Sequence, residues 1–203
     1  MHPLLHKQKR KWSGLMIGIL LSTCLWQLAT AGWIQGKAII AQQLLDHSWN
    51  QMRIDPALQD KPWLNKPWPW ADTWPVAKLL VPQYDIEQIV LAGDSGSSLA
   101  FGPGYSFAGA EPNTTGTAMI SAHRDTHFRF LKKIKPGDTI ILQTTKKTIH
   151  YKVDSLNIVD SKTYRLQSVS DRQTLVLVTC FPFEAITPGG SLRYLVFAHQ
   201  QFI

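Results

Sequence analysis

Between Trp12 and Trp33 the chain contains no charged residue: WSGLMIGILLSTCLWQLATAGW. As a helix, these residues would be about 33 Å long, which matches a bilayer hydrocarbon core of roughly 30 Å. Tryptophans at both ends suit the two membrane interfaces. This stretch therefore predicts a membrane-spanning helix over 12–33.

The charges around this stretch predict its orientation. Four basic residues lie in 7–11, and only Lys37 lies close after the apolar stretch. The positive-inside rule then places the N-terminus in the cytoplasm and residues from about 34 onward outside it. A cleaved signal peptide is the alternative, because Ala29-Thr30-Ala31 resembles a cleavage site. The apolar stretch is longer than a typical signal core and carries the bulky Trp26 near that point, which favours an uncleaved anchor. In either case the remainder of the chain is exported.

The net charge of +7 and the pI of about 9.5 suggest a nucleic-acid-binding protein only until the basic tail is set aside. Residues 1–11 hold 4 of the 21 Lys and Arg and no acidic residue, so the remainder has 17 basic against 14 acidic residues, or +3. Such a balance is typical of an ordinary soluble surface and excludes a polybasic nucleic-acid interface. The 44% of hydrophobic residues suffices for a core.

Four segments are predicted: a cytoplasmic tail over 1–11, the membrane anchor over 12–33, an extension over 34–74 and a domain over 75–203. Within the extension, apolar residues of 36–52 follow helical spacing and predict an amphipathic helix. The prolines that follow exclude a regular helix. That stretch is either an extended linker or an ordered strap on the domain or the membrane. If this stretch were free, its four tryptophans would leave much apolar surface in water, so a strap is favoured. The tryptophans are Trp63, Trp68, Trp70 and Trp74.

From residue 75 onward the pattern is mainly β. Short runs rich in Val, Ile, Thr and Tyr alternate with Gly, Pro, Asn, Asp and Ser turns. The candidate strands are Val76–Val81, Glu87–Ala92, Thr117–Ala122, Asp138–Gln143, Thr148–Val153, Leu156–Val159, Thr174–Thr179 and Arg193–Ala198. Short helical turns are expected around Ser97–Phe101 and within Thr126–Ile134. About eight such strands predict a small closed or nearly closed β-barrel.

Cys180 is the first candidate for chemistry. It ends the hydrophobic strand Thr174–Thr179, which would display the thiol rigidly at the rim of the sheet. The other cysteine, Cys24, lies in the apolar span, so Cys180 has no disulfide partner in an oxidising compartment. A buried structural cysteine is the alternative to a nucleophile.

His123 and Arg193 complete the candidate site. His123 follows the apolar strand Thr117–Ala122, and an imidazole exchanges protons near neutral pH, as thiol chemistry requires. Arg193 begins the last strand, thirteen residues after Cys180, and a guanidinium can hold a carbonyl or an oxyanion. Taken singly, each also fits a structural histidine or a surface charge.

Other residues near these invite weaker interpretations. Asp125 fits a turn better than a partner that orients His123, and His127, His150 and His199 fit structural or solvated roles. The histidines show no zinc-ligand spacing, and neither a metal nor a cofactor site is expected.

Three elements in this order resemble the sortase family: His123 within SAHRD, Cys180 after TLVLVT, and Arg193 at the start of RYLVFA. The resemblance covers roughly 75–200. The strap PWPWADTWPVA and the loop CFPFEAITPGGSLRY are most similar to class GN sortases of Gram-negative proteobacteria.

The resemblance implies a cysteine transpeptidase, and with it a thiol protease and hydrolase, that acts on exported proteins with a C-terminal Leu-Pro-x-Thr-Gly-like sorting signal. Cys180 would attack the Thr–Gly carbonyl, His123 would protonate the leaving amine, and Arg193, together with Thr179, would stabilise the oxyanion. An amine acceptor of unknown identity would resolve the thioester, and no cofactor is required. The resemblance also implies an inner-membrane protein with one span and a periplasmic catalytic domain.

Two other functions remain open. An L,D-transpeptidase-like acyltransferase would place its cysteine in a Ser-His-Gly-Cys context, from which Thr179-Cys180-Phe181 departs. A membrane-tethered β-barrel binding module without catalysis would keep its function when Cys180 is replaced by alanine.

Overall fold

The structure, a computed structural model, describes residues 3–111, 114–166, 172–185, 187 and 189–201. Its contacts divide the chain into two compact units, Met1–Gln42 and Gln43–Ile203. From Pro3 onward the first unit is helix, and the second contains the end of that helix, the extension and a barrel.

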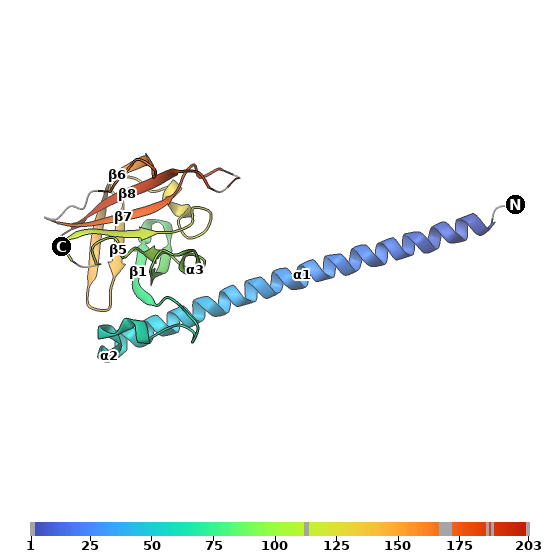
Figure 1. Ribbon diagram of the computed structural model, residues 1–203, viewed down its shortest axis with the longest axis horizontal. Helices are drawn as coiled ribbons and strands as arrows, with labels where there is room; N and C mark the ends of the chain where they lie inside the picture. The colour runs from blue at the N-terminus through green and yellow to red at the C-terminus, as the bar shows by residue number, and fades with distance from the viewer. Residues whose placement is uncertain (1–2, 112–113, 167–171, 186, 188, 202–203) are drawn as a thin grey trace. The chain divides into compact units, whose positions relative to one another are not determined.

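Helix α1 is continuous from Pro3 to Ile54, as Figure 1 shows. The expected anchor over 12–33 and the expected amphipathic helix over 36–52 are therefore parts of one continuous helix. Gly32 and Gly36 each cost only about 1 kcal/mol relative to alanine and do not block a helical turn. Within the described residues, the stretch Met16–Ile54 contains a window long and apolar enough to cross a membrane, a property that a signal sequence shares.

The end of α1 belongs to the second unit and packs on the outer face of the barrel. Leu45, Trp49 and Met52 form a buried cluster with Ile89 and Leu91. These three helical residues are spaced four and three apart, which places them on one face of the helix. The helix end is thus held by an apolar cluster of its own on strand β2, separate from the core inside the barrel.

The expected strap is ordered over most of its length. It begins with helix α2 (Pro56–Asp60) and the 3₁₀ turn η1 (Pro62–Leu64). Asn65 then exchanges hydrogen bonds with Ser48 of α1, donating to its carbonyl at 2.6 Å and accepting from its hydroxyl at 2.8 Å.

Two of the four strap tryptophans cover the domain. Trp68 packs edge-on against Phe101 at 4.8 Å between ring centroids, and Trp74 lies 6.5 Å from Phe107. Trp63 and Trp70 are exposed, so only part of the tryptophan surface is buried on the domain.

Within the described residues, eight strands form a closed barrel in the order β1-β2-β3-β4-β7-β8-β6-β5 (Figure 1). Their bounds are β1 Pro75–Val81, β2 Ile86–Ala92, β3 Gly104–Tyr105, β4 Gly116–Ser121, β5 Thr139–Gln143, β6 Thr148–Asp160, β7 Gln173–Cys180 and β8 Leu192–Gln201. The pairs β2–β3 and β4–β7 are parallel, and the others are antiparallel. The expected closed, mainly β barrel is confirmed.

Besides small shifts at the ends of the predicted strands, the structure differs from the prediction in two places. The expected strands Thr148–Val153 and Leu156–Val159 are one strand, β6, because a register shift between Val153 and Ser155 lets pairing with β8 continue. Strand β3 was not predicted, since two residues in a glycine-rich connection carry no alternation. Gly104 is nevertheless required there: a Cβ would lie 2.4 Å from the Gly93 carbonyl oxygen.

Short turns connect the strands near the expected positions. Helix α3 (Gly96–Leu99) lies between β2 and β3, and its N-cap Ser95 accepts a hydrogen bond from the Ser98 backbone. A 3₁₀ turn, η3 (Arg129–Lys132), lies between β4 and β5 and buries Phe130 and Leu131 in the barrel. A further turn, η2 (Pro82–Tyr84), joins β1 and β2.

Alternating side chains fill the barrel interior. Every second residue of β1 is buried, and β7 is buried without interruption over Thr174–Leu177. A strand buried on both faces is held firmly by its neighbours, so the residue at its end has a well-defined position. This property matters for Cys180, the last residue of β7.

Candidate active site

Strands β4 and β7 bring two of the predicted site residues to one edge of the barrel. The strands are parallel neighbours, with Ser121 opposite Val178. Beyond the last strand residue, the Ala122 amide still donates to the Val178 carbonyl at 3.1 Å. Extending this register by two residues places His123 level with Cys180.

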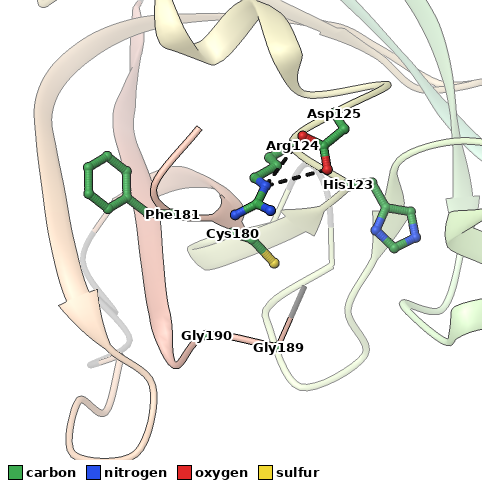
Figure 2. Close-up of a pocket in the computed structure, with 7 residues that line it drawn as sticks. All are labelled: His123, Arg124, Asp125, Cys180, Phe181, Gly189 and Gly190. Carbon is green, nitrogen blue, oxygen red and sulfur yellow. Dashed lines mark hydrogen bonds and ion pairs between the residues drawn. The ribbon is translucent and has the colours of Figure 1, made fainter. Parts of the chain in front are cut away.

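The two side chains line one surface pocket, together with Arg124, Asp125, Phe181, Gly189 and Gly190. Figure 2 shows the Cys180 thiol between the Arg124 guanidinium and the Gly189–Gly190 segment, with the His123 ring to one side. Cys180 is partly exposed and His123 is exposed, so a substrate can reach both groups. A thiol beside an imidazole in an open pocket is the arrangement used by cysteine nucleophiles.

Thr179 connects the ends of the two strands. Its side chain is 2% exposed, and its hydroxyl donates to the Ala122 carbonyl at 2.7 Å. The bond joins the residue before Cys180 to the residue before His123. The expected share of Thr179 in holding an oxyanion is not supported, because its hydroxyl proton is already committed to a buried carbonyl.

Arg193 lies opposite Cys180 in the antiparallel ladder of β7 and β8. Directly opposed residues of such a ladder project to the same face of the sheet. The Arg193 guanidinium, however, is not among the pocket-lining groups: its Nη1 donates to the carbonyls of Gly190 at 2.6 Å and Leu192 at 2.9 Å. The structure therefore places Arg193 next to the pocket and behind one of its walls.

A family model described as a Sortase domain matches residues 79–201. This segment holds 123 of the 203 residues and contains His123, Cys180 and Arg193. The chain belongs to the sortase family. Sortases are cysteine transpeptidases, which agrees with a thiol and an imidazole in one pocket.

Individual sortases are similar to this chain at modest identity. Sortase D of Bacillus subtilis (strain 168) is 26% identical over 123 residues, which make up 60% of this chain and 62% of that protein. The matched segment therefore spans less than two thirds of the length of the Bacillus subtilis protein.

Solved sortase structures share the fold. A Clostridium perfringens sortase D5 transpeptidase superposes with a TM-score of 0.65 at 21% identity, covering 80% of this chain and 99% of that one. The pilus-related sortase C of Group B Streptococcus gives a TM-score of 0.57 at 28% identity, covering 63% of this chain and 67% of that one.

Arg124 is the residue of this sortase pocket that sequence reasoning missed. It lies between His123 and Asp125 in a segment that predicts only a turn, yet it is 8% exposed. Its burial depends on carbonyls of the segment after Cys180, about sixty residues away in the chain. The sequence around Arg124 therefore does not predict that the side chain is buried. The only available signal was an arginine adjacent to the predicted catalytic histidine.

Asp125 and His127 flank the sortase histidine in different ways. The Asp125 carboxylate pairs with Nε of Arg124 at 3.3 Å, an arrangement that directs it toward the arginine. Burial, and to a smaller extent the charge of His123, lower the pKa of His127 below its usual value.

The two remaining candidate histidines lie on the barrel wall away from the pocket. His199 of β8 forms an ion pair with Asp154, and His150 pairs with Ile141 and Gln201 in β6. The structural roles expected for both agree with these positions.

Proposed function

We propose that the chain is a membrane-anchored sortase that cleaves a Leu-Pro-x-Thr-Gly-like sorting signal and transfers the exported protein to an amine. The observation that supports this proposal most is that Cys180 and His123 line one pocket at the shared edge of parallel strands β4 and β7. Because Cys180 ends the buried strand β7 and His123 directly follows the buried end of β4, their separation is set by the core of the barrel.

The proposed reaction has two halves. The Cys180 thiolate attacks the carbonyl between Thr and Gly of the signal, forming a tetrahedral oxyanion. The C–N bond then breaks, His123 as imidazolium gives its proton to the departing glycine amine, and a thioester on Cys180 remains. An incoming amine loses a proton to His123 and displaces the thiolate, with water as a slower nucleophile.

Arg193 is proposed to hold the substrate carbonyl or the oxyanion. Two features support this role. Arg193 is opposite Cys180 in the ladder, and both of the hydrogen bonds that its guanidinium donates within the described residues come from Nη1. The guanidinium thus keeps Nε and Nη2 as donors. A guanidinium cannot lose its charge, so it stabilises an oxyanion at any working pH.

The proposed location is the inner membrane, with the N-terminus in the cytoplasm and the sortase domain in the periplasm. Most of the apolar side chains that the structure describes in the first unit are exposed, among them Leu20, Leu25 and Trp26, and lipid would cover them. Intact-mass measurement of the protein from membranes distinguishes an uncleaved anchor from processing near Ala31. The class GN assignment is supported by the strap PWPWADTWPVA and by the loop CFPFEAITPGGSLRY.

A peptide assay tests the activity. The full chain in detergent micelles is incubated with a panel of Leu-Pro-x-Thr-Gly-like peptides and analysed by mass spectrometry. We expect a peptide fragment ending in Thr attached to Cys180, and faster release of that fragment when hydroxylamine is added, because thioesters react rapidly with it. Cys180→Ala is the control and should show neither adduct nor cleavage.

The result also separates the alternatives. A folded protein that gives no adduct across the panel, or a Cys180→Ala variant that retains full function, contradicts the transpeptidase proposal and favours a binding module. A panel of small amines in place of hydroxylamine then ranks candidate acceptors by the rate at which each resolves the thioester.

A further inference from the structure

Arg124 has an environment that a surface arginine would not have. The side chain is 8% exposed, and its nearest acidic partner, Asp125, is 68% exposed. An arginine loses most of its hydration when it is buried, so such a position requires strong acceptors in return. Figure 2 shows its guanidinium at the pocket, near the Cys180 thiol.

Backbone carbonyls of the segment after Cys180 supply those acceptors. Nη1 of Arg124 donates to the Pro182 carbonyl at 2.7 Å, and Nη2 donates to the Ala185 carbonyl at 2.6 Å. Nε faces the Asp125 carboxylate. One planar guanidinium therefore holds two carbonyls of a single loop at once, which the single ammonium of a lysine does not reproduce.

These bonds connect the two halves of the pocket. Arg124 directly follows His123, and the carbonyls that it holds lie two and five residues after Cys180. The same loop continues to Gly189 and Gly190, which form the facing part of the pocket. The loop itself carries hydrogen bonds from Phe181 N to Leu192 O and from Ala185 N to Pro182 O.

We propose that Arg124 is a positioning residue that fixes the Phe181–Ala185 loop against the His123 segment and thereby sets the shape of the cleft in which the substrate is acylated. Its contribution to turnover rests on the proposed function, whereas its hold on the loop does not. A second link to this loop, the ion pair between Lys132 and Glu184, is exposed on both sides and is therefore expected to contribute little.

Hydrogen exchange of the full chain in micelles tests the hold on the loop without a substrate. In the unaltered protein, the two hydrogen-bonded amides of the loop, those of Phe181 and Ala185, should exchange at least about tenfold more slowly than in a free peptide. In Arg124→Lys and Arg124→Gln they should exchange about tenfold faster than in the parent, while amides of Gln173–Cys180 keep their rates. Arg129→Lys, an exposed neighbour, and Lys132→Gln should leave the loop rates within about threefold of the parent.

Kinetics with a cleaved peptide test the consequence for the cleft. Both Arg124 variants should lose about 100-fold in kcat/KM. A displaced Phe181–Ala185 loop would no longer hold the scissile carbonyl of the peptide in position for attack by the Cys180 thiol. Alkylation of Cys180 by iodoacetamide, read on its own peptide to separate it from Cys24, should change by less than about threefold, because a small reagent needs no formed cleft.

Three results would overturn the inference. The first is loop amides in the unaltered protein that exchange as in a free peptide, which needs no variant. The second is an Arg124→Lys variant that keeps the parent loop rates and kcat/KM. The third is equal acceleration in the loop and in β7, which would make Arg124 a general stabiliser. If the parent cleaves no peptide, the proposed function fails, while the exchange data still decide whether Arg124 holds the loop.

Discussion

The edge where β4 and β7 end differs sharply from the start of β8, although both contribute to the same candidate site. At the first, His123 and Cys180 follow buried strands, and the 2% exposed Thr179 ties the strand ends together through the Ala122 carbonyl. At the second, Arg193 is half-buried, and its guanidinium binds carbonyls one and three residues away.

This difference follows from what each group has to do. Proton transfer and thiol attack need heavy atoms at hydrogen-bond distance, and an error of about 1 Å costs roughly 100-fold in rate. A guanidinium attracts an oxyanion over a longer range and can reorient as the charge develops. The buried strand ends therefore suit the bond-making groups, and the more exposed side chain of Arg193, on a backbone paired with both β6 and β7, suits a cation.

The largest effect is expected at the ends of β4 and β7. His123→Gln should reduce kcat/KM for peptide cleavage by about 10²–10⁴-fold, because the leaving amine then lacks its proton donor. The measurement is steady-state cleavage of the best peptide of the panel, with the circular dichroism spectrum as a check of folding. His150→Gln, a barrel-wall histidine outside the pocket, should stay within about threefold of the parent. A His123→Gln enzyme that cleaves at the parent rate would remove His123 from the mechanism.

A smaller effect is expected at the start of β8. Arg193→Gln should lower kcat/KM by about 10²–10³-fold, the cost of losing one oxyanion donor, while unfolding free energy changes by about 0.5 kcal/mol or less. Arg165→Gln is a matched control, since this exposed arginine also donates to local carbonyls, those of Lys162 and Tyr164. Equal activity of the Arg193 and Arg165 variants would show that Arg193 is only a surface charge.

The barrel could be predicted because its strands are long enough to alternate, as β1 does over Pro75–Val81. The pocket pair could be predicted because His123 and Cys180 each follow an apolar strand, and a parallel pair of strands ends at one edge. Strand β3 could not be predicted, since its two residues are too few to show alternation. The burial of Arg124 could not be predicted either, since it depends on carbonyls far away in the chain. The sequence predicts the anchor and the amphipathic helix as separate elements, whereas α1 joins them, because apolarity can change along a helix without interrupting its hydrogen bonds.

A third variant tests the tie between the strand ends. Thr179→Val keeps the shape of the side chain but leaves the buried Ala122 carbonyl without its hydroxyl donor, which should cost about 1–3 kcal/mol of unfolding free energy. Activity should fall by about tenfold, because the separation of His123 and Cys180 is then less tightly set. Thr179→Ser retains the donor and should recover most of both losses. If valine and serine behave alike in denaturant unfolding and in cleavage, the hydroxyl does not tie the strands.

The smallest effect is expected from His127 and concerns its burial from water near the ends of β4 and β7. Burial, and secondarily the charge of His123, lower the pKa of His127 below its ordinary value of 6.5. The unfolded chain therefore binds a proton more readily than the native protein, so stability falls as pH drops from about 6.5 through the lowered folded pKa. His127→Gln should flatten this part of the stability profile, measured by urea unfolding between pH 5 and 7.5, while His47→Gln, exposed on α1, should not. If the unfolding free energies of the parent and of His127→Gln change with pH in the same way, His127 is not shielded from water. The two parts of the site would then not differ in their access to water.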